Sequence, residues 1–162
     1  MRRLAAACLL LAACGSGAPV ATVSPYGGVC TSREGLPDPR CTPGDTDPRV
    51  TPGNVRETIC RRGYTASVRP LRDASHLLKL EVTKAYGVAG VPFAKIELDH
   101  LIPLSLGGSS DPRNLWPQFR TGPANVADKD AIASSLNRRV CRGLLGLRQA
   151  QRAMARDWRT AG

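Results

Sequence analysis

The sequence is poor in aromatic residues and in histidine, and it shows no internal repeat. Phe, Trp and Tyr together make up 4% of its 162 residues, and there are two histidines. A hydrophobic core therefore has to be built mostly from Leu, Val, Ile and Ala. The length suits one domain with a tail, and a core of this kind in a small domain usually needs a covalent or metal staple.

Several familiar motifs are also missing. No two cysteines have the CxxC spacing of a zinc ribbon or of a thiol redox site. No helix-turn-helix or zinc-finger pattern is present, which argues against recognition of a specific DNA sequence. Beyond the first residues, no apolar run is long enough to cross a membrane. The missing CxxC spacing favours disulfides over a sulfur-bound metal as the element that stabilises the small core.

The N-terminal residues are typical of an export signal. Arg2-Arg3 precedes an apolar stretch, Leu4 to Ala13, which is too short to span a bilayer. Leu11-Ala12-Ala13-Cys14 resembles the lipobox of bacterial lipoproteins, in which the cysteine is acylated. We expect residues 1–13 to be removed as a signal peptide and Cys14 to carry lipid, so that the exported protein is anchored in the cell envelope. Cleavage by an ordinary signal peptidase is the alternative.

The remaining cysteines fit an exported protein. Cys8 would leave with the signal and Cys14 would be lipidated, so four of the six cysteines remain. An even number of cysteines outside the cytosol predicts disulfides, and four cysteines permit three pairings. We favour Cys30–Cys41, which are close in sequence, and Cys60–Cys141, which join two predicted helices.

Composition divides the mature chain into two parts. Residues 14–52 are rich in Gly, Pro, Ser, Thr and Asp and lack periodicity, as in a tether or a loosely folded arm. Residues 53–162 form the predicted domain, and its pattern predicts an α+β fold. Its expected elements are a helix from Asn54 to Cys60, a strand over 64–69, a helix over about 73–86, a strand over 93–101, a short strand over 114–117 ended by Pro117, and helices over 125–141 and 147–158.

The charge balance favours a polyanionic partner. The formal net charge is +10, and removing Arg2 and Arg3 leaves 21 basic and 13 acidic residues, or +8. Nucleic acid or an anionic envelope surface would be attracted to such a protein. A genome composition that favours arginine is the alternative explanation.

One ordered set of residues carries a chemical signature. Asp99-His100 lies at the end of a predicted strand and is followed by Gly107-Gly108, by Asn114-Leu115-Trp116-Pro117 and by a helix. This order resembles the HNH, or ββα-metal, nuclease family, whose core is a short β-hairpin followed by a helix. Further matches to an exported branch of that family are Thr58-Ile59-Cys60, Val68-Arg69-Pro70, Lys129-Asp130 and Val140-Cys141.

The resemblance implies roles for individual residues. His100 would be the general base that takes a proton from water, which suits a neutral imidazole near pH 7. Asp99 would bind a divalent metal ion, Mg²⁺ first, with Mn²⁺, Zn²⁺ or Ni²⁺ as alternatives. Asn114 would lock the loop or orient His100. Asn125 matches the third position of the family as a metal ligand, or it is a helix N-cap.

Two other residues have open roles. Glu97 lies on the same strand face as Asp99 and is either an auxiliary ligand or a salt-bridge partner. Arg69 either binds phosphate or forms a structural ion pair. The expected function is a metal-dependent endonuclease that cuts DNA or RNA with little sequence specificity, without a small-molecule cofactor. The alternative is an inactive HNH-like lipoprotein that acts as a binding or structural module.

Overall fold

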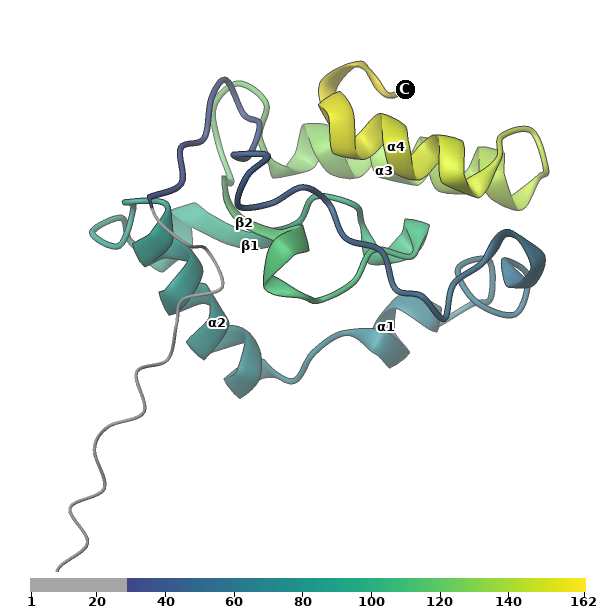
Figure 1. Cartoon of the computed structure of the whole chain (residues 1–162), viewed down its shortest axis with the longest axis horizontal. Helices are drawn as coiled ribbons and strands as arrows, with labels where there is room; N and C mark the ends of the chain where they lie inside the picture. The colour runs from purple at the N-terminus through teal and green to yellow at the C-terminus, as the bar shows by residue number, and fades with distance from the viewer. Residues whose placement is uncertain (1–28) are drawn as a thin grey trace, which may run out of the picture.

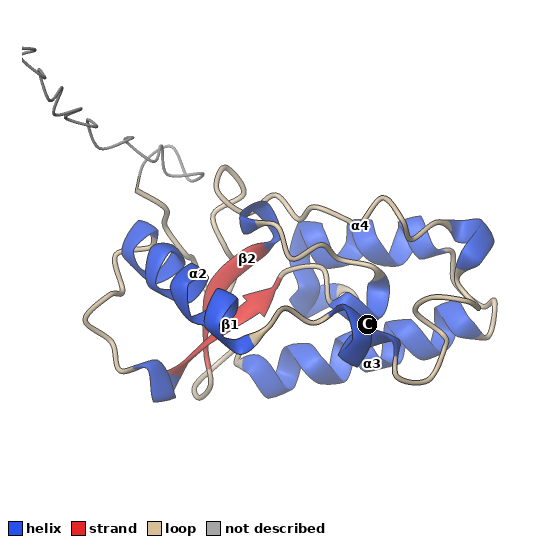
Figure 2. Ribbon diagram, turned by 90° about the horizontal axis from the view of Figure 1, so that it is seen from below, coloured by secondary structure: helices blue, strands red, loops and turns tan. Residues whose placement is uncertain are grey.

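Two antiparallel strands lie at the centre of the fold. The computed structural model describes residues 29–162, and in it β1 (Ile96–His100) pairs with β2 (Leu115–Phe119), so that His100 lies opposite Leu115. Figures 1 and 2 show this hairpin between α2 (Arg72–Ala85) on one side and the helix pair α3 (Val126–Cys141) and α4 (Leu147–Asp157) on the other. The fold is α+β, as predicted.

The predicted helices over 73–86, 125–141 and 147–158 correspond to α2, α3 and α4. Both α3 and α4 turn an apolar stripe inward, and their contact is central to the core. Trp116 of β2 and Trp158, just after α4, are the largest buried side chains. The buried apolar side chains of the helix pair are Ala133, Leu136, Val140, Leu147, Ala150 and Met154.

The segment predicted as a strand over 64–69 is helical instead. It forms α1 (Tyr64–Val68), which follows Gly63 in a left-handed conformation at φ 82°. A lone strand here would leave its backbone groups without partners, whereas a helical turn satisfies its own. The helix predicted from Asn54 to Cys60 is not formed either. A 3-10 helix spans Pro52–Asn54, and hydrogen-bonded turns follow it through Cys60.

The strand boundaries also differ from the prediction. The residues Phe93–Lys95 form a 3-10 helix before β1, and β2 continues through Pro117 to Phe119. Pro117 lies opposite Leu98 within the ladder. A two-stranded ribbon tolerates a proline because each strand has an outer edge that needs no ladder hydrogen bond.

Residues 29–52 pack on the domain, in contrast to the tether expected over residues 14–52. Cys30, Cys41 and Val50 are buried in the core. The hydroxyl of Thr42 lies 2.7 Å from that of Tyr86 and donates to the carbonyl of Leu115. This segment, dark blue in Figure 1, crosses the hairpin without regular structure, which explains why periodicity did not reveal it.

Both favoured disulfides are present. Cys30 pairs with Cys41, and Cys60 pairs with Cys141 with their Cα atoms 5.5 Å apart. Two disulfides indicate an oxidising compartment outside the cytoplasm. The signal peptide and the lipidation predicted at Cys14 lie outside the described residues. Within residues 29–162, every helix is too short or too polar to span a bilayer.

The two disulfides should differ in their contribution to stability. The Cys60–Cys141 bridge closes a separation of 81 residues and Cys30–Cys41 one of 11. Loop-closure entropy predicts that Cys60→Ser with Cys141→Ser costs up to about 4–5 kcal/mol, and that the other pair costs about 3 kcal/mol. Urea unfolding of the two double variants measures both losses. A larger loss from the short loop would contradict this explanation.

Candidate functional site

The turn that follows β1 is closed by a buried asparagine. The Oδ1 atom of Asn114 accepts a hydrogen bond from the backbone N–H of Ile102 at 2.9 Å, and its Nδ2 donates to the carbonyls of Ile102 and Ser109 at 2.9 and 2.8 Å. The loop-locking role expected for Asn114 therefore has a direct structural basis. Its contacts are to the backbone and not to the ring of His100.

Glycine is required where this turn is tightest. A Cβ atom on Gly108 would lie 1.7 Å from the carbonyl oxygen of Ile102 and 2.8 Å from Nδ2 of Asn114. Gly107 has φ 72°, which L-residues with a side chain rarely adopt. The glycine pair thus allows the loop to approach the strand end closely.

This turn and two helices enclose a polar pocket of about 220 Å³. The pocket lies where the end of β1 meets the start of α3 and the residues around α1. Asp99 and His100 both line it, although neighbouring residues of an ideal strand point to opposite faces. The polar residues lining the pocket are Thr65, Arg69, Glu97, Asp99, His100, Ser105, Lys129, Asp130 and Ser134.

A buried lysine connects α3 to the strand end. The Nζ atom of Lys129 donates to the carbonyl of His100 at 2.6 Å and lies 2.7 Å from Oδ2 of Asp99, and the lysine side chain is 1% exposed. The contact of Lys129 with Asp99 is an ion pair. Lys129 holds the carboxylate and the backbone of the two signature residues at once.

The imidazole of His100 is neutral at pH 7. Its Nε2 lies 3.0 Å from Oγ of Ser110. Burial lowers the pKa of His100 to about 4; Asp99 opposes this effect, while Lys129 and Arg69 add to it. A neutral ring can accept a proton, which a histidine held protonated cannot do.

Asp130 is a pocket residue for which the sequence assigned no role. Burial raises the pKa of its carboxyl group, and the negative charge of Asp99 raises it further, while Lys129 and Arg69 lower it. The carboxyl groups of Asp99 and Asp130 are therefore close enough for their charges to interact. Lys129-Asp130 was visible as a pair in the sequence, but only the orientation of α3 places it beside Asp99.

Asn125 serves as the N-cap of α3. Its Oδ1 accepts hydrogen bonds from the backbone of Ala127 at 2.8 Å and of Asp128 at 3.3 Å, and its Nδ2 donates to the carbonyl of Gly122. The Asp128 side chain completes a capping box. Asn125 does not line the pocket of Asp99 and His100, so the cap is the role that this geometry supports.

Glu97 and Arg69 both line the pocket. Glu97 accepts a hydrogen bond from Arg120 at 2.6 Å, which is the salt-bridge role considered for it. Arg69 is exposed, and among residues 29–162 its guanidinium group forms neither an ion pair nor a hydrogen bond. Its guanidinium group therefore has all its donors available for an anion.

The side chains fit a weakly held divalent cation better than a caged one. Within residues 29–162, no three His, Cys, Asp or Glu side chains form a ready-made metal cluster. The Oδ2 of Asp99 is buried, with the ammonium group of Lys129 2.7 Å away as its ion-pair partner, and Asp130 lies within electrostatic reach. One or two carboxylates, completed by water and phosphate oxygens, are a common arrangement for Mg²⁺. The ammonium group of Lys129 would compete for the same carboxylate.

Comparisons with known proteins give no assignment. No family model matches this chain, and no curated protein and no solved structure is significantly similar to it.

Lys129 should be important for stability. Lys129→Met keeps the length of the side chain but leaves the Asp99 carboxylate and the His100 carbonyl without their partner, so we expect a loss of about 3–5 kcal/mol. Lys84→Met, at an exposed position of α2, is the control and should change stability by less than about 0.5 kcal/mol. Urea unfolding compares them; similar small losses would contradict the proposed importance of the pair.

The depressed pKa of His100 should appear in the pH dependence of stability. The folded protein binds fewer protons than the unfolded chain between pH 6.5, the ordinary value, and about 4. Stability should therefore decline as the pH falls through this window. His100→Asn should remove this part of the decline. Unfolding midpoints measured from pH 7 to pH 4 test it, and parallel curves for the two proteins would count against a partly buried, neutral His100.

Proposed function

We propose that the protein is an exported, HNH-type, metal-dependent nuclease that hydrolyses the phosphodiester backbone of DNA or RNA. The observation that carries the proposal is the pocket in which a neutral His100 lies beside Asp99, with Arg69 and Lys129 close enough to influence its pKa. A base, a carboxylate and positive charge are the groups that phosphodiester hydrolysis requires.

Each residue has a part in this chemistry. If Nε2–H of His100 donates to the Ser110 hydroxyl, Nδ1 is left to take the proton from a water whose oxygen attacks phosphorus. The bond from phosphorus to the leaving oxygen then breaks, and the leaving oxygen takes up a proton from solvent water. Arg69 stabilises the negative charge that develops on the phosphate. Asp99 and Asp130 would hold a divalent ion, which supplies positive charge to phosphate and leaving oxygen.

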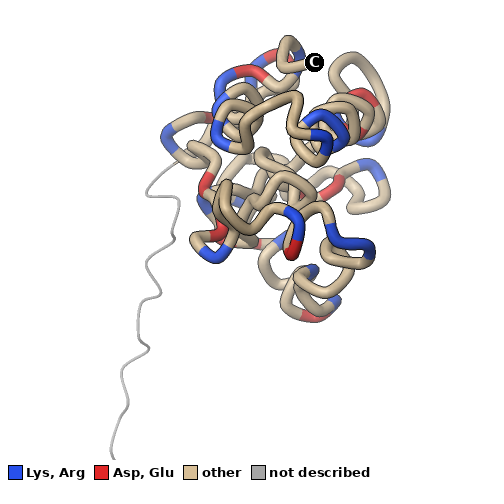
Figure 3. Tube along the Cα trace, turned by 90° about the vertical axis from the view of Figure 1, so that its right-hand side faces the viewer, with Lys and Arg blue, Asp and Glu red and all other residues tan. Residues whose placement is uncertain are grey.

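Surface charge supports a polyanionic substrate. Figure 3 shows Lys and Arg distributed over several elements around the molecule. Attraction of this kind favours the nucleic-acid backbone without reading base sequence. Together with the lipidation that we propose at Cys14, it is consistent with an enzyme held at the cell envelope that meets nucleic acid outside the cytoplasm.

A second candidate is a catalytically inactive binding module on an HNH-like scaffold. The specific observation in its favour is the ammonium group of Lys129, which lies 2.7 Å from the carboxylate that would bind the metal. Such a module would bind nucleic acid without cutting it, and loss of His100 would leave binding unchanged.

Cleavage assays separate the two candidates. The chain from Gly15 onward, with oxidised cysteines, is incubated with plasmid and with RNA in Mg²⁺, in Mn²⁺ and in chelator. We expect metal-dependent cleavage that falls by roughly 100- to 10,000-fold in His100→Asn, as is typical for loss of a general base. His76→Asn is the matched control, because His76 is exposed and does not line the pocket.

The control should cleave at the wild-type rate. Absence of cleavage with either metal would refute the enzyme, and full activity of a folded His100→Asn protein would refute the proposed site.

A further inference from the structure

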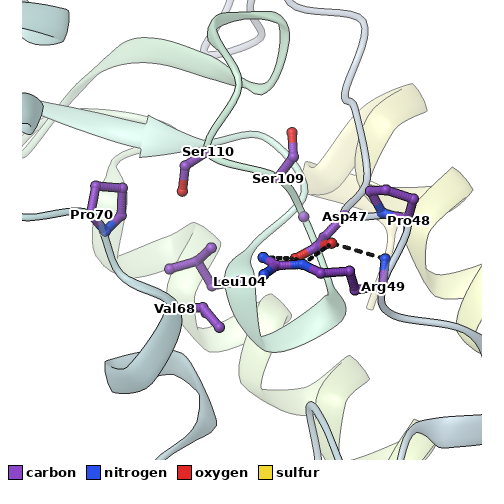
Figure 4. Close-up of a pocket in the computed structure, with 9 residues that line it drawn as sticks. Asp47, Pro48, Arg49, Val68, Pro70, Leu104, Ser109 and Ser110 are labelled. Atoms are coloured by element: carbon purple, nitrogen blue, oxygen red, sulfur yellow. Dashed lines mark hydrogen bonds and ion pairs between the residues drawn. The ribbon is translucent and has the colours of Figure 1, made fainter.

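A second hollow adjoins the pocket of His100. Its volume is about 360 Å³, and Leu104 lines both spaces. Ser110 also lines the second hollow, and its Oγ lies 3.0 Å from Nε2 of His100. The two spaces therefore share Leu104 in their walls, and the contact between Ser110 and His100 links a wall of one to a wall of the other. Figure 4 shows the second hollow, which is lined by Asp47, Pro48, Arg49, Val68, Pro70, Leu104, Gly108, Ser109 and Ser110.

One wall of this hollow is a fixed guanidinium plane. Arg49 donates from Nε and Nη2 to the carboxylate of Asp47 at 2.7–3.2 Å, and its backbone N–H also donates to Oδ1 of Asp47. Asp47 is itself buried, and its N–H donates to the carbonyl of Gly107 in the tight turn. The Arg49 side chain remains 80% exposed. A charged, flat group is thus held in place while its face stays open.

The other walls are apolar below and polar above. In the view of Figure 4, Leu104 lies between Pro70 and Arg49, Val68 lies below Leu104, and Ser109 and Ser110 lie along the upper rim. Apolar surfaces and guanidinium planes accept the face of an aromatic ring, and hydroxyl groups accept or donate hydrogen bonds at its edge. The volume lies near the lower end of the range of about 300–1,000 Å³ for small-ligand pockets.

We propose that this hollow binds one unstacked nucleobase of a single-stranded polynucleotide whose neighbouring phosphate lies at His100. The proposal rests on the phosphodiesterase function proposed above and adds a substrate class to it. A base within a duplex is stacked and paired, so it must leave the helix before it can enter the hollow. The enzyme should therefore prefer single strands to duplexes of the same sequence.

The chain offers a matched control for Arg49. Asp38-Pro39-Arg40 repeats the sequence of Asp47-Pro48-Arg49, and Arg40 binds Asp38 through the same Nε and Nη2 atoms at 3.1 and 2.8 Å. The Arg40 side chain is 78% exposed, and Arg40 does not line the second hollow. Arg40→Ala thus removes the same charge from the same kind of turn, away from the proposed base site.

The experiment measures KM and kcat for wild type, Arg49→Ala, Arg49→Lys and Arg40→Ala. The substrates are a single-stranded oligonucleotide, its duplex and a fully abasic oligomer of equal length. We expect the single strand to be preferred at least tenfold. Both Arg49 variants should raise KM for the single strand roughly tenfold, as expected for loss of one stacked base, because lysine keeps the charge but lacks the plane. Arg40→Ala should match wild type.

On the abasic oligomer, the KM ratio between Arg49→Ala and Arg40→Ala should fall toward one. Equal KM values for the two alanine variants on the base-containing strand would overturn the proposal. Full rescue by Arg49→Lys, or equal cleavage of duplex and single strand, would also overturn it.

If the wild type cleaves nothing, the proposed function fails, and the fluorescence anisotropy of a labelled oligothymidylate then tests binding to the hollow alone. Weaker binding by Arg49→Ala than by Arg40→Ala then supports the base site, and equal binding refutes it.

Discussion

Asn114 makes three hydrogen bonds to the backbone on both sides of the turn between β1 and β2, and the site depends on this closure. Without it, the loop would leave the strand end and Ser110 would not reach the ring of His100. The close approach of Gly108 to Ile102 belongs to the same constraint, because no other residue fits there. One buried amide thus fixes the position of the residues proposed to act on phosphate.

A second constraint comes from α3. Lys129 contacts the Asp99 carboxylate and the His100 carbonyl, and Asn137, two turns later, donates to the carbonyl of Ser105. The helix therefore holds both ends of the segment that forms the pocket. The pocket therefore has the buried ion pair of Lys129 and Asp99 on one side and the neutral imidazole of His100 on the other. The same turn supports the second hollow, since Gly107 anchors Asp47 and thereby Arg49.

Local sequence patterns predicted the α+β fold, the three main helices and the pairing of both disulfides. They also placed Asp99, His100 and Asn114 near one turn, because strand ends and glycine pairs have local signatures. The position of Asp130 was not predictable in this way, since it depends on how α3 is rotated against the hairpin. Asn125 fits a ligand or a cap equally well in sequence, and only its contacts distinguish the two. Residues 29–52 show no hydrophobic periodicity in the sequence, so their packing was not predicted. Disulfide, turn and side-chain contacts hold them on the domain.

The central claim is that the pocket of Asp99 and His100 receives a phosphodiester together with a divalent ion. A crystal structure of His100→Asn with Mn²⁺ and an uncut single-stranded oligonucleotide tests it most directly, because the anomalous scattering of manganese locates the ion. We predict manganese at the Asp99 carboxylate, with a backbone phosphate in the same pocket. An ordered oligonucleotide bound elsewhere, with neither manganese nor phosphate in this pocket, would contradict the account.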